Sequence, residues 1–221
     1  MRQILAPPLG HYLADLHQPV DPLIEEVRAA GIGAGLPLVE PETGRLLRGL
    51  VTALHARSVL EIGTAIGYSA LWMAQALEAG GRLISLELDP ARAATARQHL
   101  ERAGLSETVS VIVGDASRFA HKVAGPFDLI FQDGDKRLYE PLLDTLIGLL
   151  RPGGVLVTDN VLWDGEVVEG LVESPRHDQA STEAIRSYNR RLAGEPRLLT
   201  TFLPLGDGVA LSVRIRRGRT T

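Results

Sequence analysis

An acidic and an amide side chain interrupt an apolar stretch late in the chain. Residues 154–165 read GVLVTDNVLWDG, so Asp159 and Asn160 follow a β-branched, leucine-containing run and precede further apolar residues. Polar oxygens that are buried without a partner destabilise a fold. We therefore expect Asp159 and Asn160 to face a partner that uses their oxygens.

A second carboxylate ends the preceding apolar run. Asp133 closes FDLIFQD, residues 127–133. If the two runs form neighbouring parallel strands, their ends lie close together and three oxygen-bearing side chains converge. Two carboxylates and an amide, without histidine or cysteine, favour a hard cation: Mg²⁺, or Ca²⁺ or Mn²⁺. The alternative for Asp159 and Asn160 is a turn or a helix cap.

Lys136 follows Asp133 by three residues, in QDGDKRLYEP. A desolvated lysine near a cation can have a lowered pKa and accept a proton, which arginine cannot do. Of the 23 lysines and arginines in the chain, only Lys122 and Lys136 are lysine, and this scarcity favours a functional role. The alternative is a surface lysine on the first turn of a helix.

The segment EIGTAIGYS, residues 61–69, has the character of a ligand-binding turn. Gly63 and Gly67 allow a sharp turn and a close approach of a ligand to the backbone. Glu87 ends the next apolar run and can accept hydrogen bonds from both hydroxyls of a ribose. Glu61 suits a positively charged ligand, and no lysine or arginine is present for a pyrophosphate. A nucleoside with a cationic group, such as S-adenosylmethionine, therefore fits better than NAD or ATP.

These residues need a scaffold, and the hydrophobic pattern predicts one. Short apolar runs alternate with amphipathic helical segments from Arg57 onward, which is typical of βαβ units in a mostly parallel sheet covered on both faces. The five expected strands are 58–63, 82–88, 109–115, 127–133 and 154–160, and the helical segments between them are 68–80, 90–104, 116–124 and 139–150.

Every unusual polar residue lies at the carboxyl end of one of these strands, where doubly wound sheets bind their ligands. Helix capping would explain Asp115 and Asp133, but glutamates are weak caps and capping explains them poorly. The strand-end residues are Glu61, Glu87, Asp115, Asp133, and Asp159 with Asn160.

The two ends of the chain extend this core. Residues 21–30 and 42–56 are helical in pattern, and the proline- and glycine-rich stretch 31–41 between them reads as a loop. Near the C-terminus we expect a helix at 181–193 and two strands, 197–205 and 208–216. The GDG turn signal between those strands predicts an antiparallel edge pair, which makes seven strands in all. We expect one α/β domain over 1–221, with N-terminal helices in 1–56 and a doubly wound core in 57–221.

Composition narrows the class of protein. The chain has 221 residues, is 45% hydrophobic and contains no cysteine, which excludes disulfides, thiolate metal sites and cysteine nucleophiles. No signal peptide or membrane-spanning run is recognisable, so we expect a cytoplasmic protein without membrane contact. A net charge of −4 gives no global support for nucleic-acid binding, although the tail RIRRGR at 214–219 is basic.

As a set, these motifs resemble the cation-dependent O-methyltransferases, the family of catechol and caffeoyl-CoA O-methyltransferases. The resemblance runs from about Leu36 to Arg214. It rests on EIGTAIGYSALWMA, LELDP, VGDA, the segment from Asp133 to Tyr139, and TDNVLWDG. IRSYNRRL and PLGDGVALSVR are similar to the bacterial branch, which includes the tRNA 5-hydroxyuridine methyltransferase of bacilli.

The resemblance implies roles for individual residues. Lys136 would be the general base. Where bacterial relatives often read Asp-Ala-x-Lys, this chain has Gly134 and Asp135, and the resemblance does not say whether Asp135 touches the metal. Asp133, Asp159 and Asn160 would bind the divalent ion. The residues implied in S-adenosylmethionine binding are Val39, Glu61, Gly63, Ser69, Glu87, Asp115, Ala116 and Asp133.

The sequence therefore predicts a methyltransferase acting on a hydroxyl of a catechol-like small molecule with two vicinal oxygens. The alternative is the same chemistry on 5-hydroxyuridine of tRNA, which the resemblance of the C-terminal part to the bacterial branch and arginines 186, 190, 191, 214, 216 and 217 keep open. A cofactor-binding module without catalysis is disfavoured, since the proposed ligands and base are all present. The resemblance also suggests a homodimer. The N-terminal helices are either its contact surface or part of the acceptor pocket.

Overall fold

One seven-stranded sheet forms the centre of the computed structural model, which describes residues 7–120 and 122–215. Its order is β3-β2-β1-β4-β5-β7-β6; the first five strands are parallel, and β7 is antiparallel to both its neighbours. The predicted α/β class, mostly parallel sheet and antiparallel edge pair are confirmed. The strands are β1 (Ser58–Ile62), β2 (Arg82–Glu87), β3 (Val109–Val113), β4 (Phe127–Gln132), β5 (Leu150–Asp159), β6 (Leu198–Leu203) and β7 (Val209–Arg214).

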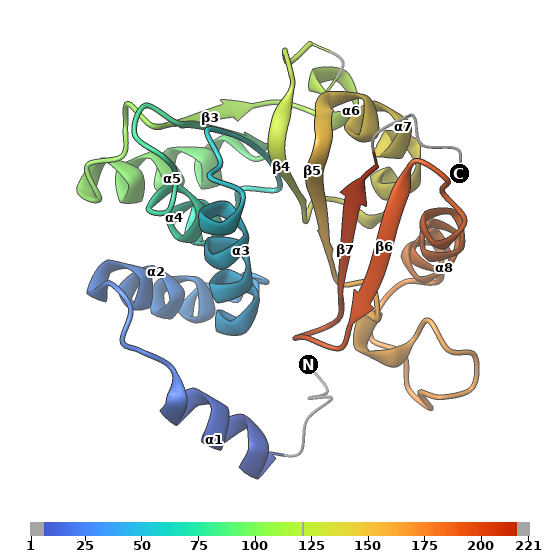
Figure 1. Ribbon diagram of the computed structural model, residues 1–221. Helices are drawn as coiled ribbons and strands as arrows, with labels where there is room; N and C mark the ends of the chain where they lie inside the picture. The colour runs from blue at the N-terminus through green and yellow to red at the C-terminus, as the bar shows by residue number, and fades with distance from the viewer. Residues whose placement is uncertain (1–6, 121, 216–221) are drawn as a thin grey trace.

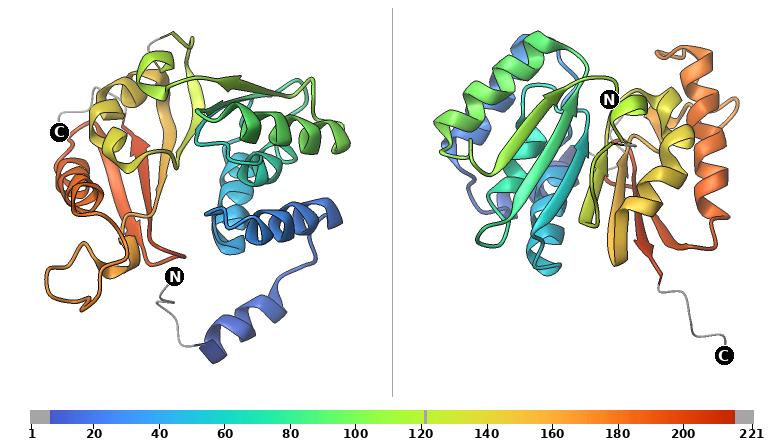
Figure 2. Two further views of the ribbon diagram at one scale, coloured as in Figure 1. Left: turned by 180° about the vertical axis from the view of Figure 1, so that it is seen from behind. Right: turned by 90° about the horizontal axis from the view of Figure 1, so that it is seen from above.

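Helices cover both faces of the sheet (Figures 1 and 2). One face packs against α2 (Pro22–Gly33), α3 (Pro41–Ala53), α4 (Tyr68–Ala74) and α5 (Pro90–Arg102). The other packs against α6 (Ala116–Phe119), α7 (Tyr139–Leu149) and α8 (Gln179–Ala193). Two short 3₁₀ turns, η1 (Lys136–Leu138) and η2 (Trp163–Gly165), flank the sheet edge. No helix in the described ranges is both long enough and apolar enough to cross a membrane.

The two-sided cover explains why the parallel strands read as continuous apolar runs. Successive side chains of a strand point to opposite faces. Val59 and Leu129 accordingly enter the core under α2 to α5, whereas Leu60 and Ile130 enter the core under α7 and α8. All four side chains are fully buried.

The main departures from the sequence prediction lie at element ends. Helix α2 continues to Gly33, although a loop is predicted from Gly31. A side chain at position 31 would place its Cβ within 2.4 Å of Leu38 Cδ1, so this glycine serves close packing rather than ending the helix. Strand β5 begins at Leu150 rather than 154, through an irregular pairing with β4. Helices α4 and α6 stop at Ala74 and Phe119, earlier than predicted, and α1 (Pro7–Leu16) is unpredicted.

Strand register brings the candidate residues together. Gln132 pairs with Thr158 across β4 and β5, so Asp133 and the end of β5 follow side by side. The chain order along the sheet reverses between β1 and β4, and this switch point is where open α/β sheets bind ligands. Asp159 also pairs with Val209 of β7, which brings the β6–β7 turn to the same place.

Candidate active site

A cavity of about 770 Å³ opens at the carboxyl ends of the parallel strands. Glu61 and Ser69 do not line it, because their side chains are buried beneath the backbone turn after β1. The cavity therefore collects most of the predicted site from segments far apart in the sequence. The predicted residues that line it are Val39, Gly63, Glu87, Asp115, Ala116, Asp133, Lys136, Asp159 and Asn160.

Lys136 lies at the centre of the oxygen-rich half of the cavity. Its Nζ donates hydrogen bonds to Asp133 Oδ1 at 2.9 Å, to Asn160 Oδ1 at 2.6 Å and to the Tyr139 hydroxyl at 2.8 Å. Three acceptors match the three hydrogens of an ammonium group. The surface-lysine interpretation is therefore wrong, since only 13% of the Lys136 side chain is exposed.

Asp159 is the most buried member of the predicted metal trio, with 3% of the residue exposed. Its Oδ1 accepts a hydrogen bond from the backbone N–H of Asn160 at 2.8 Å. Burial, and then the nearby charge of Asp133, raise the pKa of the Asp159 carboxyl well above its usual range. Two carboxylates crowded in this way favour a compensating positive charge.

This donor set fits a hard divalent cation in its chemistry. The oxygens of Asp133, Asp159 and Asn160 all come from the adjoining ends of β4 and β5, and such oxygens are the ligands that Mg²⁺ and Ca²⁺ prefer. Within the described residues no group of three His, Cys, Asp or Glu side chains has the arrangement of a metal centre. A cation here would therefore be held by two carboxylates and one amide.

Asp207 is a member of this cluster that the sequence analysis missed. It belongs to the GDG segment, which predicted only a turn. Its carboxylate accepts a hydrogen bond from the backbone N–H of Asp164. Burial raises the pKa of Asp207 to about 6, although the nearby Asn160 side chain lowers it in part as a hydrogen-bond donor, and only 8% of the residue is exposed. The signal in the sequence was an aspartate between two glycines, which a turn alone explains.

An aromatic wall closes one side of the same half. The rings of Trp163 and His177 stack with their centroids 3.8 Å apart, and Lys136 Nζ lies 5.8 Å from the Trp163 ring. His177 Nε2 is 3.3 Å from Asp164 Oδ2, which fixes the imidazole over the indole. The sequence analysis included Trp163 in a motif but did not assign His177 to the site.

The turn after β1 forms the other half of the cavity. Gly63 has a φ of +97°, and a Cβ at this position would come within 2.4 Å of the backbone oxygen of Asp133. Only glycine fits here. Glu87 Oε2 accepts a hydrogen bond from Ala65 N at 2.7 Å, and its Oε1 accepts one from Asp89 N at 3.0 Å. The Glu87 carboxylate is thus held at the cavity wall by backbone groups.

Glu61 is a fully buried carboxyl behind this turn. Ser69 Oγ donates to its Oε1 at 2.5 Å, and Ser85 donates to its Oε2. Burial nevertheless dominates and raises the pKa of Glu61 to about 7. Glu61 and Ser69 therefore lie together beneath the predicted cofactor site rather than on its surface.

Two acidic residues have local structural roles. Asp115 caps α6, because its Oδ1 accepts a hydrogen bond from Ser117 N at 2.8 Å, and it lines the cavity as well. Asp133 is not a cap, since its side chain bonds Lys136. Asp135 caps η1 and pairs with Arg137 at 2.7 Å, and this ion pair accounts for the acidic side chain that follows Gly134.

Comparisons with known proteins agree on one family. The sequence model described as "O-methyltransferase" matches residues 17–215. A protein of Niastella koreensis named catechol O-methyltransferase is 36% identical over 216 residues, covering 93% of this chain and 96% of its own. Two solved structures are similar throughout. An O-methyltransferase of Bacillus cereus, in complex with SAH, has a TM-score of 0.82 and 34% identity, and the match covers 94% of this chain and 97% of that one. The O-methyltransferase TomG of Streptomyces achromogenes, in complex with SAM, has a TM-score of 0.85 and 30% identity, and the match covers 98% of this chain and 100% of that one.

Glu61 predicts a specific pH dependence of stability. Its pKa is raised from 4.5 to about 7 in the folded chain. The folded state thus holds this proton more tightly than the unfolded state, and stability from this group is lost as the pH rises through that window. The difference in unfolding free energy between Glu61→Gln and wild type should therefore change by roughly 3 kcal/mol, in favour of the variant, as the pH rises from 4.5 to 7.5. Urea unfolding across this range measures it, and parallel profiles for the two proteins would contradict the assignment.

Proposed function

The chain belongs to the O-methyltransferase family, and from this premise we propose that it methylates a hydroxyl of a catechol-like small molecule, using S-adenosylmethionine and a divalent cation. One contact carries the proposal. The backbone of Asp133 lies against Gly63, where a Cβ would come within 2.4 Å of its carbonyl oxygen. A nucleoside bound at the Gly63 turn and oxygens bound at the end of β4 would therefore share one wall of the cavity.

The nucleoside half supports S-adenosylmethionine. Glu87 presents a carboxylate suited to ribose hydroxyls, and Val39, Asp115 and Ala116 line the cavity beyond it. Two relatives of similar fold are described in complex with SAH or SAM. We assign Gly63, with Glu61 and Ser69 beneath it, to the methionine end of the cofactor, whose sulfonium supplies the methyl group.

The oxygen half supports a cation held by Asp133, Asp159 and Asn160. A bound divalent ion supplies Lewis acidity, which lowers the pKa of a coordinated hydroxyl. The crowded carboxylates, and the raised pKa of Asp159 that follows from its own burial and from the charge of Asp133, favour a cation at this position. Asp133 would contribute to both halves of the cavity, with its carboxylate to the cation and with its backbone to the wall beside the Gly63 turn.

Lys136 is our candidate for the general base, in the neutral amine form that remains after its ammonium has released a proton to solvent. Its Nζ lies within hydrogen-bond distance of two of the proposed metal ligands, so a hydroxyl placed beside them would lie next to the amine. Tyr139 and Asn160 orient the amine, and Trp163 with His177 offers a flat surface to an aromatic acceptor. The deprotonated acceptor oxygen would then attack the sulfonium methyl group, leaving S-adenosylhomocysteine.

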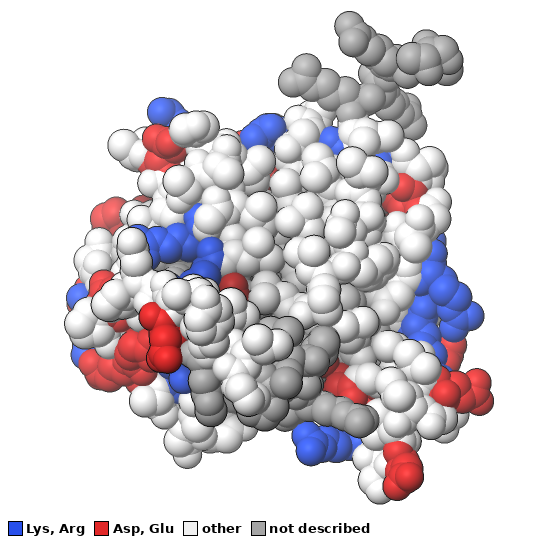
Figure 3. Space-filling view, turned by 60° about the horizontal axis from the view of Figure 1, so that its bottom comes forward, with Lys and Arg blue, Asp and Glu red and all other residues white. Residues whose placement is uncertain are grey.

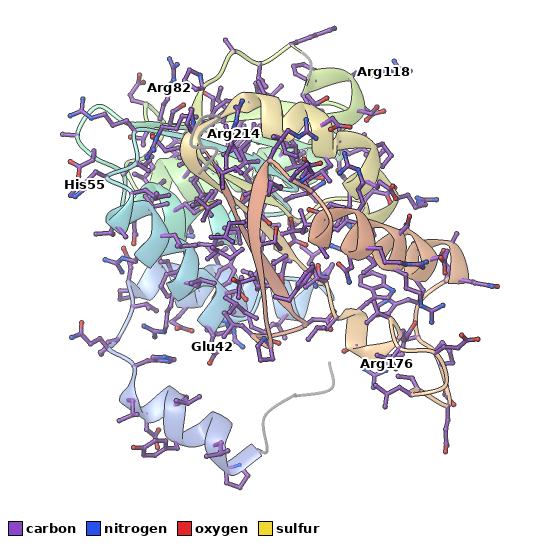
Figure 4. All side chains as sticks on the ribbon, turned by 45° about the vertical axis from the view of Figure 1, so that its right-hand side comes forward. Glu42, His55, Arg82, Arg118, Arg176 and Arg214 are labelled. Atoms are coloured by element: carbon purple, nitrogen blue, oxygen red, sulfur yellow. The ribbon has the colours of Figure 1, made fainter. Side chains whose placement is uncertain are left out.

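The tRNA alternative gains no support from the arginines that kept it open. Arg186 donates to the backbone oxygens of Glu166 and Val167, Arg190 and Arg191 pair with acidic neighbours, and Arg214 binds backbone oxygens. Figure 4 places Arg214 at the end of the sheet opposite the loop that carries Arg176. Residues 216 and 217, and most of the basic tail, lie outside the described residues. On the face in Figure 3, basic side chains form separate groups beside acidic ones rather than a continuous stripe.

A homodimer is the remaining element of the proposal. Helix α1 stands apart from the body in Figures 1 and 2, and its exposed apolar side chains Leu9, Tyr12, Leu13 and Leu16 form one stripe. A helix of 10 residues is not stable in water without packing. We propose that a second copy covers this stripe, so that residues 1–56 form the substrate and dimer region of a single cytoplasmic domain.

The acceptor and the cation can be tested in one assay. Purified enzyme with labelled S-adenosylmethionine should methylate catechol in Mg²⁺, but not phenol, which lacks the second oxygen. Excess EDTA should abolish turnover, and added Mg²⁺ should restore it, because the hydroxyl is otherwise not acidic enough. Full turnover in EDTA would remove the cation from the mechanism. Methylation of tRNA that carries 5-hydroxyuridine, with none of catechol, would transfer the assignment to the tRNA alternative.

Lys136→Met tests the proposed base. The variant keeps an unbranched side chain of similar length but cannot accept a proton, so kcat should fall by about 100-fold or more. Calorimetric affinity for S-adenosylhomocysteine should change little, because Lys136 belongs to the oxygen half. Lys122→Met is the matched control and should retain wild-type kcat. An unchanged kcat in Lys136→Met would leave Lys136 without a catalytic role.

Light scattering after gel filtration tests the dimer. Wild type should have twice the chain mass of 23.8 kDa, whereas Leu9→Glu combined with Leu16→Glu should shift it toward the monomer by placing charge in the apolar stripe. Ala14→Glu, on the opposite side of α1, is the matched control and should remain dimeric. A monomeric wild type would contradict the proposal.

A further inference from the structure

The chain between β5 and η2 has an unusual backbone. Asn160, Trp163 and Asp164 have φ values of +61°, +50° and +53°, in the left-handed region that asparagine and aspartate tolerate better than tryptophan. A bulky residue such as Trp163 costs about 1–3 kcal/mol in this region unless its surroundings enforce the conformation. This strained segment carries one proposed metal ligand and the indole of the aromatic wall, so something must hold it in place.

The β6–β7 turn supplies that support. Val161 N donates to Gly208 O, and Leu162 N donates to Asp207 O, each at 3.0 Å. The Asp207 carboxylate accepts a hydrogen bond from Asp164 N. The turn fits closely, since a Cβ at position 208 would lie 2.7 Å from Leu162 N. The backbone oxygen of Asp207 thus binds the strained segment just before Trp163, and the carboxylate of Asp207 binds it just after Trp163.

Asp207 and Asn160 line the same cavity, and the Asn160 amide lowers the pKa of the Asp207 carboxyl by acting on it as a hydrogen-bond donor. A carboxylate is an acceptor and an ammonium is a donor. With Asp207 on one side and Lys136 Nζ at 2.6 Å on the other, the Asn160 amide can satisfy both in one orientation only. Its NH₂ group points to Asp207, and its Oδ1 points into the cavity.

We propose that Asp207 is a positioning residue that orients the Asn160 amide, so that its oxygen, and not its nitrogen, faces the cation. The inference rests on the proposed cation-dependent function. It assigns Asp207 no contact with substrate or metal. Partners that orient metal ligands in this way are typically worth 10- to 100-fold in metal affinity.

Asp207→Asn is the informative substitution. An amide at position 207 retains the size of the side chain but offers one acceptor and one donor group. If its oxygen keeps the bond from Asp164 N, its NH₂ meets the NH₂ of Asn160, and Asn160 is driven to turn its nitrogen into the cavity. Asp135→Asn is the matched control, because it removes a charge from the same cavity, while asparagine caps η1 equally well.

The experiment measures Mn²⁺ affinity by electron paramagnetic resonance, at one pH, in enzyme saturated with S-adenosylhomocysteine. Asp207→Asn should weaken Mn²⁺ binding at least tenfold, and Asp135→Asn by less than about threefold. In the Asn160→Ala background, Asp207→Asn should have less than about a twofold further effect, because the residue on which Asp207 acts is gone. Affinity for S-adenosylhomocysteine should be the same in all five proteins.

Each other result has a defined meaning. If Asp207→Asn weakened Mn²⁺ binding equally in the wild-type and Asn160→Ala backgrounds, Asp207 would contribute charge only. The same would follow if Asp135→Asn weakened Mn²⁺ binding as much as Asp207→Asn does. Either result would overturn the inference. Unchanged Mn²⁺ binding in Asp207→Asn would overturn it directly. Loss of S-adenosylhomocysteine binding in that variant would assign Asp207 to the fold of the site instead. Absence of Mn²⁺ binding by wild type would contradict the proposed function itself.

Discussion

The crowding of two carboxylates at the ends of adjacent strands is the constraint on which this site depends. Asp133 and Asp159 lie side by side because β4 and β5 are in register, and burial, together with the nearby charge of Asp133, raises the pKa of the Asp159 carboxyl well above its usual range. The Lys136 ammonium provides a positive charge from η1, bonded to Asp133 and Asn160. The remaining parts of this half, from Tyr139 to the β6–β7 turn, hold these groups at hydrogen-bond distance.

The geometry of a doubly wound sheet joins this cluster to a nucleoside site. Gly63 and Asp133 follow neighbouring strands at the point where the chain order reverses, and their backbones touch because position 63 has no side chain. A methyl donor and a hydroxyl acceptor held on the two sides of this contact would need little further movement to react. Orientation of this kind can supply much of the rate of a transfer reaction.

The sequence predicted the strand ends well because each parallel strand is a short apolar run, and the polar residue that follows it is conspicuous. Asp133, Asp159 and Asn160 were identified in this way, and Lys136 was identified by its place three residues after Asp133 and by the scarcity of lysine. Asp207 and His177 were not, because a pattern along one strand does not say which antiparallel strand or distant loop returns to it. Gly31 was misread as a helix end, since its reason is contact with Leu38, and Glu61 was expected at a surface from which burial removes it.

The most direct measurement is a crystal structure of the enzyme with S-adenosylhomocysteine and Mn²⁺, read by anomalous scattering. The account predicts one strong manganese peak bounded by oxygens of Asp133, Asp159 and Asn160, with the sulfur of the nucleoside facing the same space across the Gly63 turn. A manganese peak elsewhere, or a nucleoside bound away from Gly63 and Glu87, would contradict it.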